Sequence, residues 1–181
     1  MIMRGQKKSI NRVLITAIAA VLLGIMMVMP AFAKTTTVKP KSMYIKAGVQ
    51  DSTIIKKAAK VKAGTTKVML PSKKGTCVLK FTATKSKTYT FTFSGLKPTS
   101  DSNISLGFFS FLTRVTPGVN KLKMVPANTK NGSQTIVQYG SSNMYAAYPT
   151  SNYGKIKLNK GDTVFVYVAA SHGKSINCKI K

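Results

Sequence analysis

The sequence predicts an all-β fold, an antiparallel β-sandwich or jelly roll of about eight or nine short strands preceded by a signal peptide helix. Two observations predict the sandwich. Several segments alternate apolar and polar residues with the two-residue period of a half-buried strand. Turn-forming Gly, Pro, Asn and Ser residues separate these segments at short intervals.

Residues 1–33 have the organisation of a secretory signal peptide. The positive n-region contains four basic residues, Arg4, Lys7, Lys8 and Arg12. An almost entirely apolar run follows at residues 13–28, and Pro30 precedes an A-x-A cleavage site that ends at Ala33. An uncleaved anchor is the alternative, because the run approaches the roughly 20 residues that span a bilayer. The proline and the cleavage site favour removal, so we expect a secreted mature chain with no membrane span.

Residues 34–63 are predicted to be a lead-in to the sandwich domain at 64–181. Met43, Tyr44 and Ile45 form a short stretch there that can pair as a strand. Residues 51–63 leave two alternatives open. They form either a short helix, capped by Asp51 or Ser52, or a pair of strands with lysines pointing outward.

The strand signals sharpen after residue 65. The predicted strands are residues 66–70, 77–83, 88–94, 104–112, 121–125, 135–139, 155–158, 163–170 and 175–181. In the clearest of them Tyr89, Phe91 and Phe93 point inward, the threonines between them point outward, and Gly95 ends the strand.

The two cysteines, Cys77 and Cys178, both fall on apolar faces of predicted strands, near the two ends of the domain. A disulfide between them would close a loop of about 100 residues and stabilise the fold by about 4.7 kcal/mol in the chain-entropy model. Two buried free thiols are the alternative. The sequence does not distinguish the two states.

The charge of the chain is its most informative property for function. It has 29 Lys and Arg against three acidic residues, a net charge of +26, and no Glu. Removal of the four n-region charges leaves +22, carried almost entirely by Lys. Lys is a hydrated point charge, so this surface favours diffuse attraction to a polyanion over bidentate recognition.

The chain lacks the residues that catalysis and metal binding need. Hydrolytic and metal-dependent mechanisms use carboxylates or imidazoles. The chain offers only Asp51, Asp101, Asp162 and one histidine, His172, which lies in a predicted turn. No Gly-x-Ser-x-Gly motif is present. We therefore expect no enzyme activity, no catalytic residues, no cofactor and no metal.

A Tyr-rich segment, residues 138–154, contains no Lys. Tyr provides contact area at low entropic cost. Four residues of this segment are candidate ligand contacts if it forms a loop: Tyr145, Tyr148, Asn152 and Tyr153. The alternative is that its tyrosines pack in the core.

Three blocks of residues 76–181 resemble secreted bacterial jelly-roll modules of the pre-peptidase C-terminal type. The blocks are Cys-Val-Leu-Lys-Phe-Thr-Ala-Thr at 77–84, Thr-Tyr-Thr-Phe-Thr-Phe-Ser-Gly at 88–95 and Ile-Lys-Leu-Asn-Lys-Gly-Asp-Thr-Val-Phe-Val-Tyr-Val at 156–168. The resemblance implies a jelly-roll fold and an accessory role in substrate or matrix binding. The chain departs from such modules in having no acidic residue from Asn103 to Gly161.

Two hypotheses for the function follow. The first is a secreted, cationic, non-catalytic protein that associates with an anionic wall or extracellular polymer and is retained electrostatically at the cell surface. The second is a carbohydrate- or protein-binding accessory module that uses the Tyr-rich segment. The shortage of Arg argues against specific nucleic-acid recognition. The sequence does not determine the oligomeric state.

Overall fold

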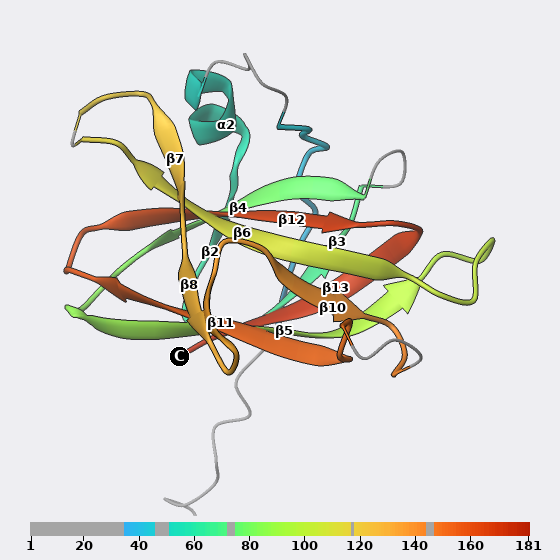
Figure 1. Ribbon diagram of the computed structural model, residues 1–181. Coiled ribbons are helices and arrows are strands. Elements are labelled where there is room, and N and C mark those ends of the chain that lie inside the picture. The colour runs from blue at the N-terminus through green and yellow to red at the C-terminus, as the bar shows by residue number, and fades with distance from the viewer. Residues whose placement is uncertain (1–34, 46–50, 72–74, 117, 144–146) are drawn as a thin grey trace, which may run out of the picture. The chain divides into compact units, whose positions relative to one another are not determined.

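The computed structural model describes residues 35–45, 51–71, 75–116, 118–143 and 147–181, which form thirteen strands and one short helix. The predicted signal peptide at 1–33 and the candidate contact Tyr145 lie outside the described residues. Figure 1 shows the strands arranged in two facing layers. The predicted all-β sandwich is confirmed.

Seven strands form the first sheet. In spatial order they are β1 (Thr36–Val38), β3 (Gly64–Met69), β13 (Gly173–Ile180), β5 (Lys87–Pro98), β11 (Ser151–Leu158), β8 (Ala127–Thr129) and β9 (Gly132–Gln134). Its β1–β3 pair is parallel and the other pairs are antiparallel.

Six strands form the second sheet. In spatial order they are β10 (Val137–Gly140), β6 (Leu106–Arg114), β12 (Thr163–Ala170), β4 (Thr76–Thr82) and β2 (Ala59–Val61), with β7 (Leu122–Val125) paired to the far half of β6. The chain passes from the second sheet to the first between β7 and β8, at Pro126 (Figure 1). A proline is tolerated at this crossing because the residue between the two strands does not have to donate an N–H to either sheet.

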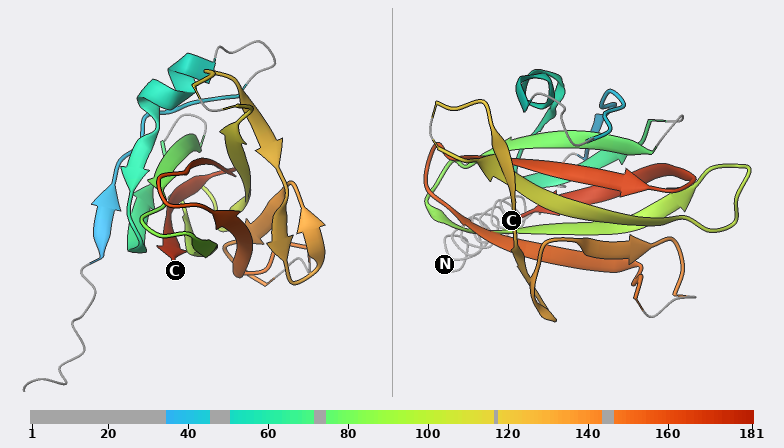
Figure 2. Two further views of the ribbon diagram at one scale, coloured as in Figure 1. Left: turned by 90° about the vertical axis from the view of Figure 1, so that its left-hand side faces the viewer. Right: turned by 45° about the horizontal axis from the view of Figure 1, so that its top comes forward.

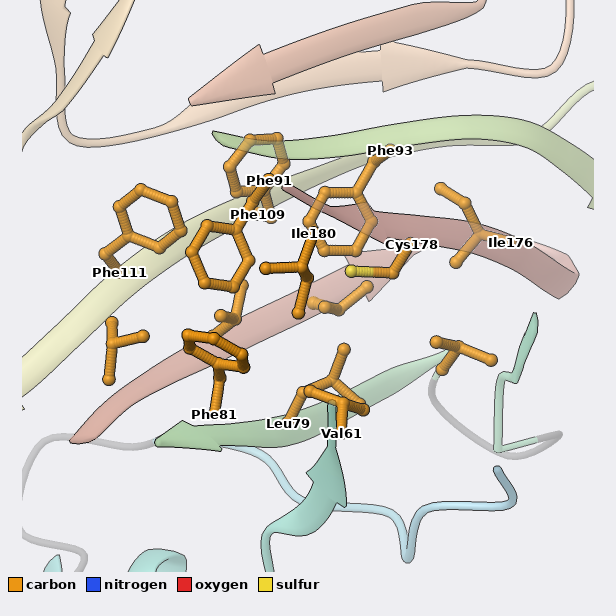
Figure 3. Close-up of a cluster of buried hydrophobic side chains, with 14 of the residues drawn as sticks. Val61, Leu79, Phe81, Phe91, Phe93, Phe109, Phe111, Ile176, Cys178 and Ile180 are labelled. Carbon is orange, nitrogen blue, oxygen red and sulfur yellow. The ribbon is translucent and has the colours of Figure 1, made fainter. Parts of the chain in front are cut away.

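The core lies between the sheets and is rich in aromatic rings (Figure 3). The predicted alternation of β5 is confirmed, because Tyr89, Phe91 and Phe93 are buried. The ring centroids of Phe91 and Phe111 are 5.0 Å apart in an edge-on contact. Burial of each such side chain contributes about 1.5–3 kcal/mol to stability.

The strand count exceeds the predicted eight or nine, because β1, β2, β8 and β9 have only three residues each. A segment that short cannot show an alternating pattern. The predicted end at Gly95 is also wrong, since β5 continues to Pro98. Asn177 pairs with Ser94 and Ser175 with Lys97, so β5 carries one extra residue there. Gly95, with φ 62°, takes the left-handed conformation of such a bulge.

Residues 51–63 contain the predicted short helix, α2 (Asp51–Lys57), and one strand, β2, in place of the pair of strands that was the alternative. Ile54 of α2 is buried against the outer face of the six-stranded sheet, in a cluster with Val78 and Phe165. Figure 2 shows α2 on this side of the sandwich. Residues 43–45 are not a strand, although the Met43 N–H donates to the Thr76 carbonyl at 3.0 Å. The residues before Gly64 therefore add β1 to the seven-stranded sheet and β2 to the six-stranded sheet. They also cover part of the outer face of the six-stranded sheet.

Candidate binding surfaces

The outer face of the seven-stranded sheet carries hydroxyls and ammonium groups. Because Tyr89, Phe91 and Phe93 point into the core, the residues between them on β5 point outward. We call this surface the Lys–Thr face. Its members are Thr65 and Lys67 of β3, Asn177 and Lys179 of β13, Thr88, Thr90, Thr92 and Ser94 of β5, and Tyr153, Lys155 and Lys157 of β11.

Strand pairing sets the order of these side chains. Thr92 lies opposite Lys179 on one side and Tyr153 on the other. Lys155 lies opposite Thr90, and its ammonium is 5.5 Å from the centre of the Tyr153 ring. Residues directly opposite each other in antiparallel strands share a face. Lysines of β11 and β13 therefore flank the threonines of β5.

Within the described residues, no lysine ammonium is paired with a carboxylate. Among the described residues the one ion pair joins His172 Nδ1 and Asp101 Oδ2 at 3.7 Å. Asp51 Oδ2 accepts the Leu122 N–H at 2.7 Å, and Asp162 Oδ2 accepts the Asn159 N–H at 2.8 Å. The positive potential of the Lys–Thr face is therefore not neutralised within the described chain.

A cationic cleft of about 630 Å³ lies next to the Lys–Thr face, beside the β7–β8 crossing. Lys80, Arg114 and Lys157 are the basic residues that line it, together with Asp162. Lys157 also belongs to the Lys–Thr face, so the two positive surfaces are continuous. No local pattern in the sequence indicates this cleft, because its lining residues come from five strands, β4, β6, β7, β11 and β12, and from loops between strands.

An aromatic groove of about 650 Å³ lies on the outer face of the six-stranded sheet. Thr76 of β4, Ala169 of β12 and Phe108 of β6 form one row across its floor. The Phe108 and Tyr167 ring centroids are 5.8 Å apart and the rings are tilted by 58°. The groove is hollow here because Ala169 has only a methyl group between larger neighbours.

Polar atoms are also present in the aromatic groove. Burial raises the pKa of Tyr167, and nearby Tyr44 raises it further, while the Thr76 side chain partly offsets this rise. Thr76 is only 7% exposed, and its Oγ1 has no hydrogen bond of acceptable geometry. Gln138 Nε2 donates to the Tyr148 hydroxyl at 3.1 Å and so fixes that ring at the edge of the groove.

The predicted ligand contacts of the Tyr-rich segment do not share one loop. Tyr148 lines the aromatic groove, whereas Asn152 and Tyr153 lie in β11. Asn152 Nδ2 donates to the Gln138 carbonyl at 2.9 Å, and Tyr153 faces outward on the other sheet. Tyr139 is a core residue whose hydroxyl donates to the Ala169 carbonyl at 3.0 Å.

Cys77 of β4 and Cys178 of β13 are free thiols, both fully buried in the core (Figure 3 labels Cys178). Burial raises the pKa of each to about 12, and nearby Cys77 contributes to the rise at Cys178. A thiol with such a pKa is protonated at neutral pH and is a poor nucleophile. The cysteines therefore contribute to packing.

Other chemical features of the described residues are few. His172 and Asp101 are exposed, with side chains 58% and 70% accessible. No three His, Cys, Asp or Glu side chains gather within the described ranges. In that same part of the chain, no helix has the length and apolarity needed to cross a bilayer.

Comparisons with known proteins give weak structural similarities. No protein-family model matches the chain, and no curated protein sequence does. The pre-peptidase C-terminal domain of a collagenase from Bacillus anthracis is similar at 11% identity and a TM-score of 0.40, covering 68% of this chain and 94% of that domain. CorA, a surface-associated copper-binding protein of Methylomicrobium album BG8, is similar at 6% identity and a TM-score of 0.40, covering 68% of this chain and 98% of that one. The weak resemblance to a pre-peptidase C-terminal module, predicted from residues 76–181, is thus also found between the folds.

Proposed function

We propose that the mature protein is a secreted, non-catalytic binding protein that associates with anionic polymers of the cell surface or its surroundings through the Lys–Thr face. The observation that carries this proposal is the pairing of β13, β5 and β11, which brings lysines together with hydroxyls and without carboxylates. Export rests on the predicted signal peptide.

The chemistry of this face suits an extended partner. Paired strands are about 4.8 Å apart, so lysines on β11 and β13 lie about 10 Å apart with the β5 threonines between them. Hydroxyls can donate to phosphate, sulfate or carboxylate oxygens that the ammonium groups attract. A flat array of this kind presents several weak contacts in place of one deep pocket. The cationic cleft extends the array at Lys157.

A salt series tests this proposal. Binding to immobilised polyphosphate should weaken with salt, because counterions are released as lysines neutralise the polymer. Four neutralised charges would give a slope of about −3 on a log–log plot, by analogy with nucleic acids. An affinity that does not change with salt would contradict the proposal.

Carbohydrate or protein binding by the Tyr-rich segment remains a second candidate, and among the described residues of that segment Tyr148 is the one that supports it. Tyr153 belongs to the Lys–Thr face, and Asn152 bonds the backbone of β10.

A further inference from the structure

The aromatic groove contrasts with the rest of the surface in charge. None of its described lining residues is charged, although the mature chain is expected to carry +22. Five large hydrophobic residues of the described chain are exposed, and three of them, Tyr44, Met124 and Ile136, line this groove. Contiguous exposed apolar groups of this kind mark interaction sites more often than scattered ones do.

The size of the groove suits a small ligand or a short stretch of a polymer. Its volume of about 650 Å³ lies within the roughly 300–1,000 Å³ of small-molecule sites. Such sites combine aromatic walls with a few polar groups that orient the ligand. Here the walls include Phe108, Tyr148 and Tyr167, and the polar groups include the Thr76 hydroxyl.

The polar atoms distinguish between classes of ligand. Thr76 Oγ1 is buried and makes no hydrogen bond of good geometry, although the Thr76 side chain lies close enough to the Tyr167 hydroxyl to lower the pKa of that tyrosine. A buried hydroxyl in this position gains free energy from a better-placed partner. A lipid chain or an apolar peptide side chain would offer no such partner. An anionic sugar would meet no cation among the described lining residues. A neutral sugar has apolar ring faces for the aromatic walls and hydroxyls for Thr76.

We infer that the aromatic groove binds a neutral oligosaccharide, with sugar rings stacked on Tyr148 and Phe108 and a sugar hydroxyl bonded to Thr76 Oγ1. This site lies on the sheet opposite the Lys–Thr face and does not depend on it. A protein with both sites would hold an anionic polymer on one sheet and a neutral glycan on the other.

The test uses the mature protein at about 1 M NaCl, where the Debye length is about 3 Å and association through surface lysines is suppressed. The probes are cello-, chito-, galacto- and manno-oligosaccharides of equal length, titrated by calorimetry. We expect salt-insensitive binding of at least one of them. Tyr148→Ala and Phe108→Ala should each weaken it about tenfold or more, as loss of an aromatic anchor does.

Two further variants separate binding from folding. Tyr153→Ala, on the opposite sheet, is the matched control and should leave oligosaccharide affinity unchanged. Thr76→Val removes the buried hydroxyl but keeps the shape of the side chain, so it should lower the affinity several-fold without lowering the melting temperature. The inference is overturned if no neutral oligosaccharide binds, if an apolar peptide binds in their place, or if Tyr153→Ala weakens binding as much as Tyr148→Ala. None of these results would change the response to polyphosphate.

Discussion

Lys155 of β11 lies directly opposite Thr90 of β5, on the side of the seven-stranded sheet that points away from the core. Lys179 of β13 stands in the same relation to Thr92 from the other side of β5. Thr65 and Lys67 of β3 complete the row beyond β13, so the fold assembles the Lys–Thr face from four separate segments of the chain.

Phe91→Ala should destabilise the domain by about 3–5 kcal/mol, because its buried ring packs against Phe81 and Phe111 and its removal leaves a cavity. Thr90→Ala, at the neighbouring outward position, should cost less than about 1 kcal/mol. Urea unfolding of both variants measures the difference. Equal losses would mean that both faces of β5 are buried.

Cys77 and Cys178 should not react with a thiol reagent at pH 8 in the native protein, because both are buried and their pKa of about 12 leaves little thiolate. After unfolding without reductant, mass spectrometry should find two labels. Their absence would show that the two residues form a disulfide. Because folding raises both pKa values from 9.0, the thiols favour the fold below pH 9, and this contribution is lost as the pH rises towards 12.

Gly75→Ala should be much more harmful than Gly161→Ala, although both glycines have positive φ, 58° and 91°. A Cβ at Gly75 would lie 1.8 Å from the Ala170 carbonyl oxygen, whereas a Cβ at Gly161 would meet nothing within 4 Å. We expect a loss of more than about 3 kcal/mol at Gly75 and about 1–2 kcal/mol at Gly161. Similar losses in thermal unfolding would contradict this account of the Gly75 turn.

The mature chain should begin at Lys34, because the A-x-A motif ends at Ala33. Mass spectrometry of protein from the culture medium determines this end. A secreted chain that retains residues 1–33 would refute the predicted cleavage.

The sequence predicted the parts of the fold that depend on local pattern. The strand predicted at 163–170 coincides with β12, and the inward set Tyr89, Phe91 and Phe93 is buried as expected. Short strands such as β1 and β8 were missed because three residues show no period. Residues 51–63 were ambiguous because a helix of seven residues and a strand of three follow each other there.

The candidate surfaces were less predictable because they depend on contacts between distant strands. The outward threonines of β5 were visible in the sequence, but the lysines beside them belong to strands whose pairing it does not reveal. Tyr148 and Tyr153 belong to one segment and had the same predicted role, yet their side chains lie on the outer faces of different sheets. Nothing in the sequence indicates that Phe108 and Tyr167 line a groove, since each also fits the pattern of a buried strand residue.

The central claim, that the Lys–Thr face binds anionic polymers, is tested most directly by two triple variants with the same change in charge. One replaces Lys67, Lys155 and Lys179 by Gln, and the other replaces Lys56, Lys57 and Lys123, which lie on α2 and β7. Affinity for polyphosphate is measured for both across a salt series. We expect the first variant to bind at least about tenfold more weakly than the second and to show a log–log salt slope that is smaller by about 2–3. Equal losses in the two variants would show that net charge alone governs binding, and would contradict the assignment of this face.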